Sequence, residues 1–194
     1  MNAVLSAVMP GAVNLLRIDH AHVMASFHHY DLGAPARTRR ALARTLFLAL
    51  EVHATVEEEI FYPAVHAVDP GLIENNLAEQ REWRLLIARL RAMDIDAPDF
   101  DSLFLELMRG VLHHVADEET QLLPQAEALL GKSRLADLGA EMTRRRMQLT
   151  APHAGELALE ALRGAPTSTL VMAAGSLLAG SYLLTHALHR TRLG

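Results

Sequence analysis

The sequence predicts an all-α protein: an up-down-up-down antiparallel four-helix bundle, followed by a C-terminal helical extension and a hydrophobic tail. The chain has 194 residues, 51% of them hydrophobic, and almost none of the alternation of β-branched and polar residues that strands show. Apolar residues instead recur every three or four positions in four long segments joined by short links, which favours antiparallel neighbours. We expect the bundle over residues 12–130, a helical extension or linker over 131–163, and the tail over 167–189.

The first helix is expected from residue 10 or 11 to about residue 30, where the segment 31–35 supplies turn chemistry. Its apolar stripe runs through Leu16, His20, Val23 and Phe27. This spacing returns to one helix face, so His20 is predicted to point into the core.

The second helix is expected to begin after Pro35 and to carry a histidine and a carboxylate on its apolar stripe. His53 and Glu57 are four residues apart, and Ile60 and Ala64 continue the same stripe. Four residues turn a helix through nearly one full turn, at about 100° each, so both polar side chains should face the core. Pro63 is expected to kink or end this helix, because proline lacks a main-chain donor.

The same pattern returns 61 residues later, in a fourth helix expected over about 101–130. There His114 and Glu118 are again four apart, with Pro124 ten residues after the histidine, and Gln121 and Gln125 continue the stripe. A single histidine on an apolar face is usually a satisfied core residue. Two histidine–carboxylate pairs in register indicate a shared metal site, since buried carboxylates need a cation.

The third helix is expected from the turn at residues 69–71 to about residue 93, with an inward stripe through Asn76, Gln80 and Trp83. By the 61-residue repeat, His20 should correspond to position 80 or 81, yet Gln80 and Arg81 stand there. In an antiparallel bundle, six polar side chains can converge at one level: His20, His53, Glu57, Gln80, His114 and Glu118.

The amino-acid composition excludes some classes of partner and of metal site. The net charge of −5 and the 5% aromatic content make nucleic acid an unsuitable partner. The absence of cysteine excludes thiolate sites and leaves His, Asp and Glu as the strong side-chain ligands. The first ten residues lack a basic n-region, so we expect a cytoplasmic main domain.

These motifs resemble the hemerythrin-like family with its HHE cation-binding domain. The resemblance covers residues 12–130 and rests on Asp19-His20 and on the two segments that run from His53 to Pro63 and from His114 to Pro124. It implies a non-haem di-iron centre in which Glu57 and Glu118 bridge two ions. His20 and His53 would be terminal ligands of one ion, and His114 would bind the other.

The third helix departs from the family pattern. The family usually has a histidine after a glutamate where this chain has Glu79-Gln80, and oxygen carriers have a further histidine where this chain has Arg84. Glutamine is a weaker ligand than imidazole, so the second ion should bind less tightly, with Glu79 as a possible substitute ligand.

The resemblance implies a metal-binding protein that binds or senses oxygen or related small oxidants. Three alternatives stay open at this point. The protein could be a di-iron oxidoreductase that consumes peroxide or nitric oxide, an iron-handling or zinc-loaded module with a mononuclear site, or a scaffold with a vestigial site.

The tail has no charged residue between Arg163 and Arg190. Residues 169–188 are apolar all round and long enough to cross about 30 Å of hydrocarbon. Small and hydroxyl residues and His186 weaken this signal, so a helix buried on protein is the alternative. We expect possible membrane association through 167–189, with the bundle anchored to the inner face.

Overall fold

A computed structural model describes residues 10–155, and within this range the protein is helical without any strand. The prediction of an all-α protein is confirmed. The tail predicted over 167–189 lies outside the described residues. Within residues 10–155, no helix has the length and apolar character needed to cross a membrane.

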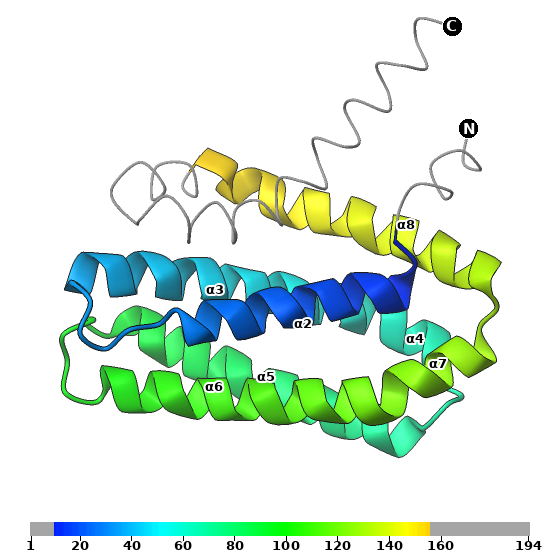
Figure 1. Ribbon diagram of the computed structural model, residues 1–194, viewed down its shortest axis with the longest axis horizontal. Coiled ribbons are helices and arrows are strands. Elements are labelled where there is room, and N and C mark those ends of the chain that lie inside the picture. Colours follow the sequence, from blue (N-terminus) through cyan, green and yellow to red (C-terminus); the bar gives the residue numbers. More distant parts are fainter. Residues whose placement is uncertain (1–9, 156–194) are drawn as a thin grey trace, which may run out of the picture.

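Four long helical segments lie side by side along the longest axis of the molecule (Figure 1). The first is α2 (Ala12–His28), and the third is α5 (Pro70–Ala92), which begins after Asp69 caps the backbone N–H of Leu72. The second comprises α3 (Ala36–Val56), η1 (Glu57–Phe61) and α4 (Tyr62–Val65), and the fourth comprises α6 (Phe100–Asp117), η2 (Glu118–Leu122) and α7 (Leu123–Leu129).

A fifth helix, α8 (Lys132–Thr150), lies over α2 and α3 and is followed by the short η3 (Ala151–His153). Gly139 lets α8 approach the start of α2 closely. A Cβ atom on this glycine would lie 2.3 Å from the Pro10 carbonyl oxygen and 2.9 Å from the Ala12 nitrogen. The absence of a side chain at position 139 therefore fixes the distance between the fifth helix and the bundle.

The segments η1 and η2 are π-helical turns, and they explain how the second and fourth helices pass their prolines. Each begins at a motif glutamate, Glu57 or Glu118, and ends two residues before Pro63 or Pro124. A proline ring clashes with the carbonyl group four residues earlier in an α-helix, and a π-turn widens the backbone there. The helical backbone continues through Pro63, so it does not end there.

Each π-turn shifts the inward face by one residue, which corrects the predicted stripes. Gln121 and Gln125, expected inward, are exposed, whereas Leu122 and Ala126 are fully buried. In the second helix, Ile60 and Ala64 are only half-buried. The deeply buried residues there are Phe61, Tyr62 and Val65.

Two apolar clusters fill the core, and the polar motif residues lie between them. One cluster contains Leu16, Val56 and Leu122; the other contains Val23, Leu50 and Val111. His20 lies between Leu16 and Val23 along α2, and His53 lies between Leu50 and Val56 along α3. Apolar packing above and below therefore keeps water from the polar layer.

Candidate metal centre

All six predicted site residues are buried in this layer. Glu57, Gln80, His114 and Glu118 have no exposed surface, and His20 and His53 are 3% and 4% exposed. Each position follows from the helical stripe that carries it. The stripe logic therefore placed every one of these side chains correctly in the core.

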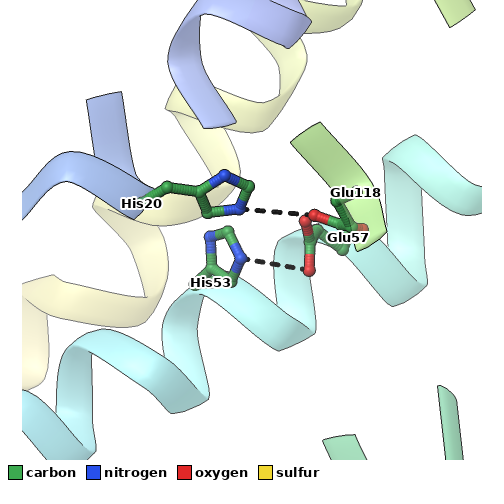
Figure 2. A group of neighbouring side chains, drawn as sticks. All are labelled: His20, His53, Glu57 and Glu118. Atoms are coloured by element: carbon green, nitrogen blue, oxygen red, sulfur yellow. Dashed lines mark ion pairs between the residues drawn. The ribbon is translucent and has the colours of Figure 1, made fainter. Parts of the chain in front are cut away.

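Four of the residues converge on one point (Figure 2). His20 from α2, His53 from α3, and Glu57 and Glu118 at the starts of the two π-turns each offer a ligand atom, and these atoms lie within 4.8 Å of one another. His20 Nε2 is 3.3 Å from Glu118 Oε2, and His53 Nε2 is 3.2 Å from Glu57 Oε2. Two imidazole nitrogens and two carboxylates therefore surround a common centre.

His114 lies near the same two carboxylates but is not part of the group of four. Its Nε2 lies 3.9 Å from Glu57 Oε2 and 3.8 Å from Glu118 Oε1. The edge of Trp83 packs against the His114 ring, with the ring centroids 4.5 Å apart, and fixes the ring plane. The two glutamates thus have three histidine Nε2 atoms within 4 Å of their oxygens.

Each of the three histidines is held by an acid at its outer nitrogen. His20 Nδ1 is 2.9 Å from Glu119 Oε1, His53 Nδ1 is 3.4 Å from Asp19 Oδ2, and His114 Nδ1 is 3.1 Å from Glu79 Oε2. An acceptor at Nδ1 keeps the proton there and leaves the Nε2 lone pair facing inward. This is the arrangement by which outer carboxylates orient metal-binding histidines.

Those acids were not predicted as site residues, with the exception of Glu79. Glu79 was considered as a substitute ligand, but its carboxylate turns outward to His114 Nδ1. A sequence signal did exist: Asp19 precedes His20, Glu119 follows Glu118 and Glu79 precedes Gln80. Each acid lies about 100° from an inward residue, close enough to reach a neighbouring helix.

The third helix contributes two side-chain amides to the layer. At positions 80 and 84, where the family resemblance implies histidines, it carries glutamine and arginine. Gln80 Nε2 donates to Glu57 Oε2 at 2.7 Å, and Asn76 Nδ2 donates to Glu118 Oε1 at 3.2 Å. Arg84, at the second such position, forms an ion pair with Glu58 instead. Asn76 was predicted inward without a site role, so its contact with Glu118 was missed.

Tyr62 was also missed, because an α-helical stripe does not bring it inward. It follows Glu57 by five residues, the spacing of one π-turn. Its hydroxyl donates to Glu118 Oε1 at 2.8 Å, accepts from Gln80 Nε2 at 2.9 Å and lies 3.3 Å from Glu57 Oε2. At the matching position of the repeat, Leu123 has no such group.

Each of the two carboxylates therefore accepts hydrogen bonds at one oxygen only. Glu57 Oε2 and Glu118 Oε1 accept hydrogen bonds from the amides and Tyr62. Glu57 Oε1 and Glu118 Oε2 are buried without a hydrogen-bond partner, as are the Nε2 atoms of His20 and His114. Buried polar atoms are rarely left unpaired, and metal ions bound in this layer would provide the missing partners. The residues present therefore fit a metal ion.

The pKa values of the buried histidines and glutamates also favour a bound cation in this layer. Burial lowers the pKa of His20, but Glu118 and Glu57 outweigh burial and raise it to about 9. Burial also opposes the charged form of His114, yet Glu118, Glu57 and Glu79 raise its pKa to about 10. Burial and the neighbouring Glu118 raise the pKa of Glu57. Protons on the histidines thus offset a concentration of negative charge that a divalent cation would offset more fully.

Comparison with known proteins agrees with the geometry. The family model described as "Hemerythrin HHE cation binding domain" matches residues 11–126. This chain belongs to the hemerythrin HHE family. The matched range contains all six predicted site residues, and the fifth helix α8 lies beyond it. The His/Glu cluster described above is the candidate cation site of this family member.

Two individual proteins are similar to the chain. A protein named "DNA nickase" from a Nostoc species is 28% identical over 110 residues, which is 56% of this chain and 31% of that protein. This chain thus matches about a third of its relative's length. A crystal structure of an HHE cation binding domain-containing protein from Mycobacterium kansasii has a TM-score of 0.64 at 21% identity. It covers 84% of this chain and 99% of the other, and shows the shared fold.

Proposed function

We propose that this hemerythrin HHE protein holds non-haem iron and binds or senses oxygen or a related small oxidant. The observation that carries the proposal is the orientation of the histidines. Three Nε2 atoms face two buried glutamates while three acids hold the outer Nδ1 atoms. The proposed metal ligands are His20, His53, Glu57, His114 and Glu118, with Gln80 as a weak sixth.

Iron is the metal that the donor set and the family favour. Imidazole and carboxylate ligands without thiolate suit iron, zinc and manganese, and the chain contains no cysteine. Bound iron would supply redox chemistry with oxygen, peroxide or nitric oxide. The chain's own residues orient the ligands, exclude water and hold a proton on the Tyr62 hydroxyl, whose pKa burial and the two glutamates raise well above its ordinary value.

The asymmetry of hydrogen bonding favours unequal occupancy of two ion positions. Beside His20, Glu118 Oε2 has no hydrogen-bond partner. Beside His53, Glu57 Oε2 already accepts from Gln80 Nε2, and the other oxygen of Glu57 has no hydrogen-bond partner. On the third-helix side, an ion would have to displace hydrogen bonds from Asn76, Gln80 and Tyr62. We therefore infer that the first ion binds between His20 and His53 and that a bridged second ion binds more weakly.

A hollow between α2 and α3 supports a small, weakly polar ligand. Its lining includes Asp19, His22, Ser26, Thr45, His53 and Arg146 and five apolar side chains: Val23, Leu42, Leu46, Ala49 and Val52. Because most of the exposed surface of this hollow is apolar, it favours a molecule of few atoms and low polarity over a large substrate. The hollow thus borders on one histidine of the proposed centre.

Elemental analysis of the full chain, together with its ultraviolet-visible spectrum, tests the proposal. After reconstitution with ferrous iron without oxygen, we expect at least about one iron per chain and a spectrum that changes on admission of oxygen and reverts on reduction. Replacement of His53 by alanine should abolish the spectral change. Iron binding below a tenth of an equivalent, or a spectrum that does not respond to oxygen, peroxide or nitric oxide, would refute the proposal.

A second candidate function is an oxidoreductase or iron-handling module with a mononuclear site. It is favoured by Gln80 and Arg84, which stand where the resemblance leads us to expect histidines. About one iron with steady consumption of peroxide or nitric oxide would identify an oxidoreductase. About one iron that is released to a chelator without any spectral response to oxidants would identify an iron-handling module.

We do not extend the Nostoc relative's name to this chain. The match covers 31% of that protein, and the net charge of −5 here is unsuited to a phosphate backbone. A gel-shift experiment with duplex DNA at low salt would show binding if this reasoning is wrong.

We also propose the finer architecture that the sequence predicts. The short connections between consecutive long helices support the antiparallel up-down-up-down order over residues 12–130. We further propose that 131–163 link the bundle to a tail over 167–189 that anchors a cytoplasmic domain to the inner face of a membrane. Membrane fractionation of the full chain and of a chain ending at residue 163 tests the anchor, which a soluble full chain would exclude.

A further inference from the structure

We propose that Glu79, His113 and Asp117 form a second cation site on the outer surface of α5 and α6. The ion it would take is a divalent cation of borderline softness, such as zinc or ferrous iron. These three residues are separate from the ligands of the proposed centre, so the inference goes beyond the proposed function. We call this group the outer site.

The geometry of the three side chains suits a small divalent ion. His113 and Asp117 are four residues apart on α6, and Glu79 faces them from α5. His113 Nδ1 is 3.0 Å from Glu79 Oε1 and 3.7 Å from Asp117 Oδ2, and one ligand atom from each residue lies within 4.8 Å of the others. Ligands at about 2.0–2.1 Å from a tetrahedral zinc are roughly 3.3 Å apart, which lies between these two distances.

Both carboxylates are held with one oxygen free to turn toward His113. Gln121 Nε2 donates to Asp117 Oδ1 at 3.0 Å, which leaves Asp117 Oδ2 on the side of the histidine. Glu79 Oε2 accepts from His114 Nδ1 at 3.1 Å, which leaves Glu79 Oε1 on the same side. These outer hydrogen bonds orient ligands before an ion arrives and reduce the entropy lost on binding.

The outer site is open to solvent, unlike the buried centre. The side chain of His113 is 67% exposed, and those of Glu79 and Asp117 are 25% and 32% exposed. An ion can therefore reach these ligands without any opening of the bundle, and water can complete its coordination. One imidazole with two carboxylates is a donor set for zinc or ferrous iron, whereas magnesium and calcium prefer oxygen alone.

Glu79 connects the outer site to the buried layer. Its Oε1 atom would bind the outer ion while its Oε2 atom continues to accept from His114 Nδ1. Both sites can thus be occupied together. Glu79 is for this reason unsuitable for the test, since its replacement would disturb His114 as well.

The test is zinc binding by the full chain, with zinc alone as the probe. Wild type, His113→Ala and Asp117→Asn are dialysed to equilibrium against the same free zinc concentration, and zinc per chain is measured by elemental analysis. His66→Ala, which removes another exposed histidine, is the matched control. We expect both outer-site variants to bind about one zinc fewer than wild type and the control to equal wild type.

Far-ultraviolet circular dichroism and thermal melts establish that each variant is folded. The zinc that remains in His113→Ala reports the buried centre separately, so loss of either site is distinguishable from loss of the other. As a second measurement, the ring nitrogens of His113 in the wild-type protein should shift in the nuclear magnetic resonance spectrum when zinc is added. Equal zinc content in wild type and both outer-site variants, or an unshifted His113 ring, would overturn the proposal and leave a hydrogen-bonded cluster.

Discussion

Replacement of Arg146 by methionine should destabilise the bundle much more than the same replacement of its neighbour Arg145. Arg146 reaches from α8 to Asp19 on α2, and its Nη1 donates to Asp19 Oδ1 at 2.8 Å while Nη2 pairs with Oδ2. Both side chains are nearly buried, at 11% and 12% exposed. Arg145 instead forms an exposed ion pair with Glu59 on the protein surface.

The size of the loss in stability depends on whether the acid that remains after each substitution is buried or exposed. Removal of one partner from a buried ion pair costs about 3–5 kcal/mol, and the residual exposure here favours about 3 kcal/mol. For a protein of this size, that corresponds to a fall in Tm of roughly 6–12 °C. Arg145→Met leaves Glu59 in solvent, so its Tm should stay close to wild type.

The difference in Tm between wild type and Arg146→Met should also depend on pH, which provides a second check of the buried ion pair. Burial raises the pKa of Asp19, but Arg146 and His53 together outweigh it and lower the pKa below its ordinary 3.8. A depressed carboxyl pKa stabilises the fold above the unfolded-state value and loses that contribution as the pH falls through the folded-state value. The difference in Tm between wild type and Arg146→Met should therefore be full above about pH 3.8 and shrink below it. Thermal melts of the full chain measure both effects, and equal Tm values for the two arginine variants would refute the reasoning.

Three further predictions concern the buried layer and the fifth helix. Gln80→His should restore a third-helix imidazole and raise bound iron toward about two per chain, measured by elemental analysis; unchanged iron content would contradict the weak-ligand role of Gln80. Gly139→Ala should lower stability by about 1–3 kcal/mol in urea unfolding, because its Cβ would meet backbone atoms of residues 10–12, whereas Gly131→Ala, with nothing within 4 Å, should be tolerated. Because the pKa values of His20 and His114 are raised, the two charged histidines stabilise the metal-free protein fully below pH 6.5. This stabilisation is lost as the pH rises through about 9 for His20 and about 10 for His114. Urea midpoints that do not fall over this pH range would count against the histidine–carboxylate pairing.

The helices and the buried site residues could be predicted because hydrophobic periodicity is a local property of the sequence. The predicted limits of the third helix, from the turn at residues 69–71 to about residue 93, agree with the observed α5 within a residue or so. The inward positions of His20, His53 and Gln80 follow from α-helical spacing, and all three are buried. Within the helix that carries each of these residues, no π-turn precedes it, so the α-helical count stays in register up to that position.

The positions that follow the motif glutamates could not be predicted from the same count. A π-turn adds one residue, so Gln121 and Gln125 turn to solvent and Tyr62 turns inward. The sequence does contain the cause, since Pro63 and Pro124 each follow a motif glutamate by six residues. Proline permits an end, a kink or a widened turn, and only packing of the whole layer decides among them.

The outer acids required tertiary structure for a different reason. Asp19, Glu79 and Glu119 lie off the apolar stripes, where a solvated acid is the ordinary expectation. Each instead meets the Nδ1 atom of a histidine on another helix. That contact depends on how neighbouring helices are set against each other, which local spacing does not encode.

The internal repeat shows why the two halves of the layer should differ in affinity for metal. The histidine–glutamate pairs match across the repeat, but Tyr62 corresponds to Leu123, and position 80 or 81 has no counterpart of His20. The first difference adds a hydrogen-bond donor, Tyr62, and the second removes a histidine ligand from the third helix. Donors from a hydroxyl and from amides already satisfy Glu57 Oε2 and Glu118 Oε1, so a cation gains less there than beside His20, where Glu118 Oε2 has no hydrogen-bond partner. If the proposed centre holds two ions, departure from symmetry at these two positions should make one ion position stronger than the other.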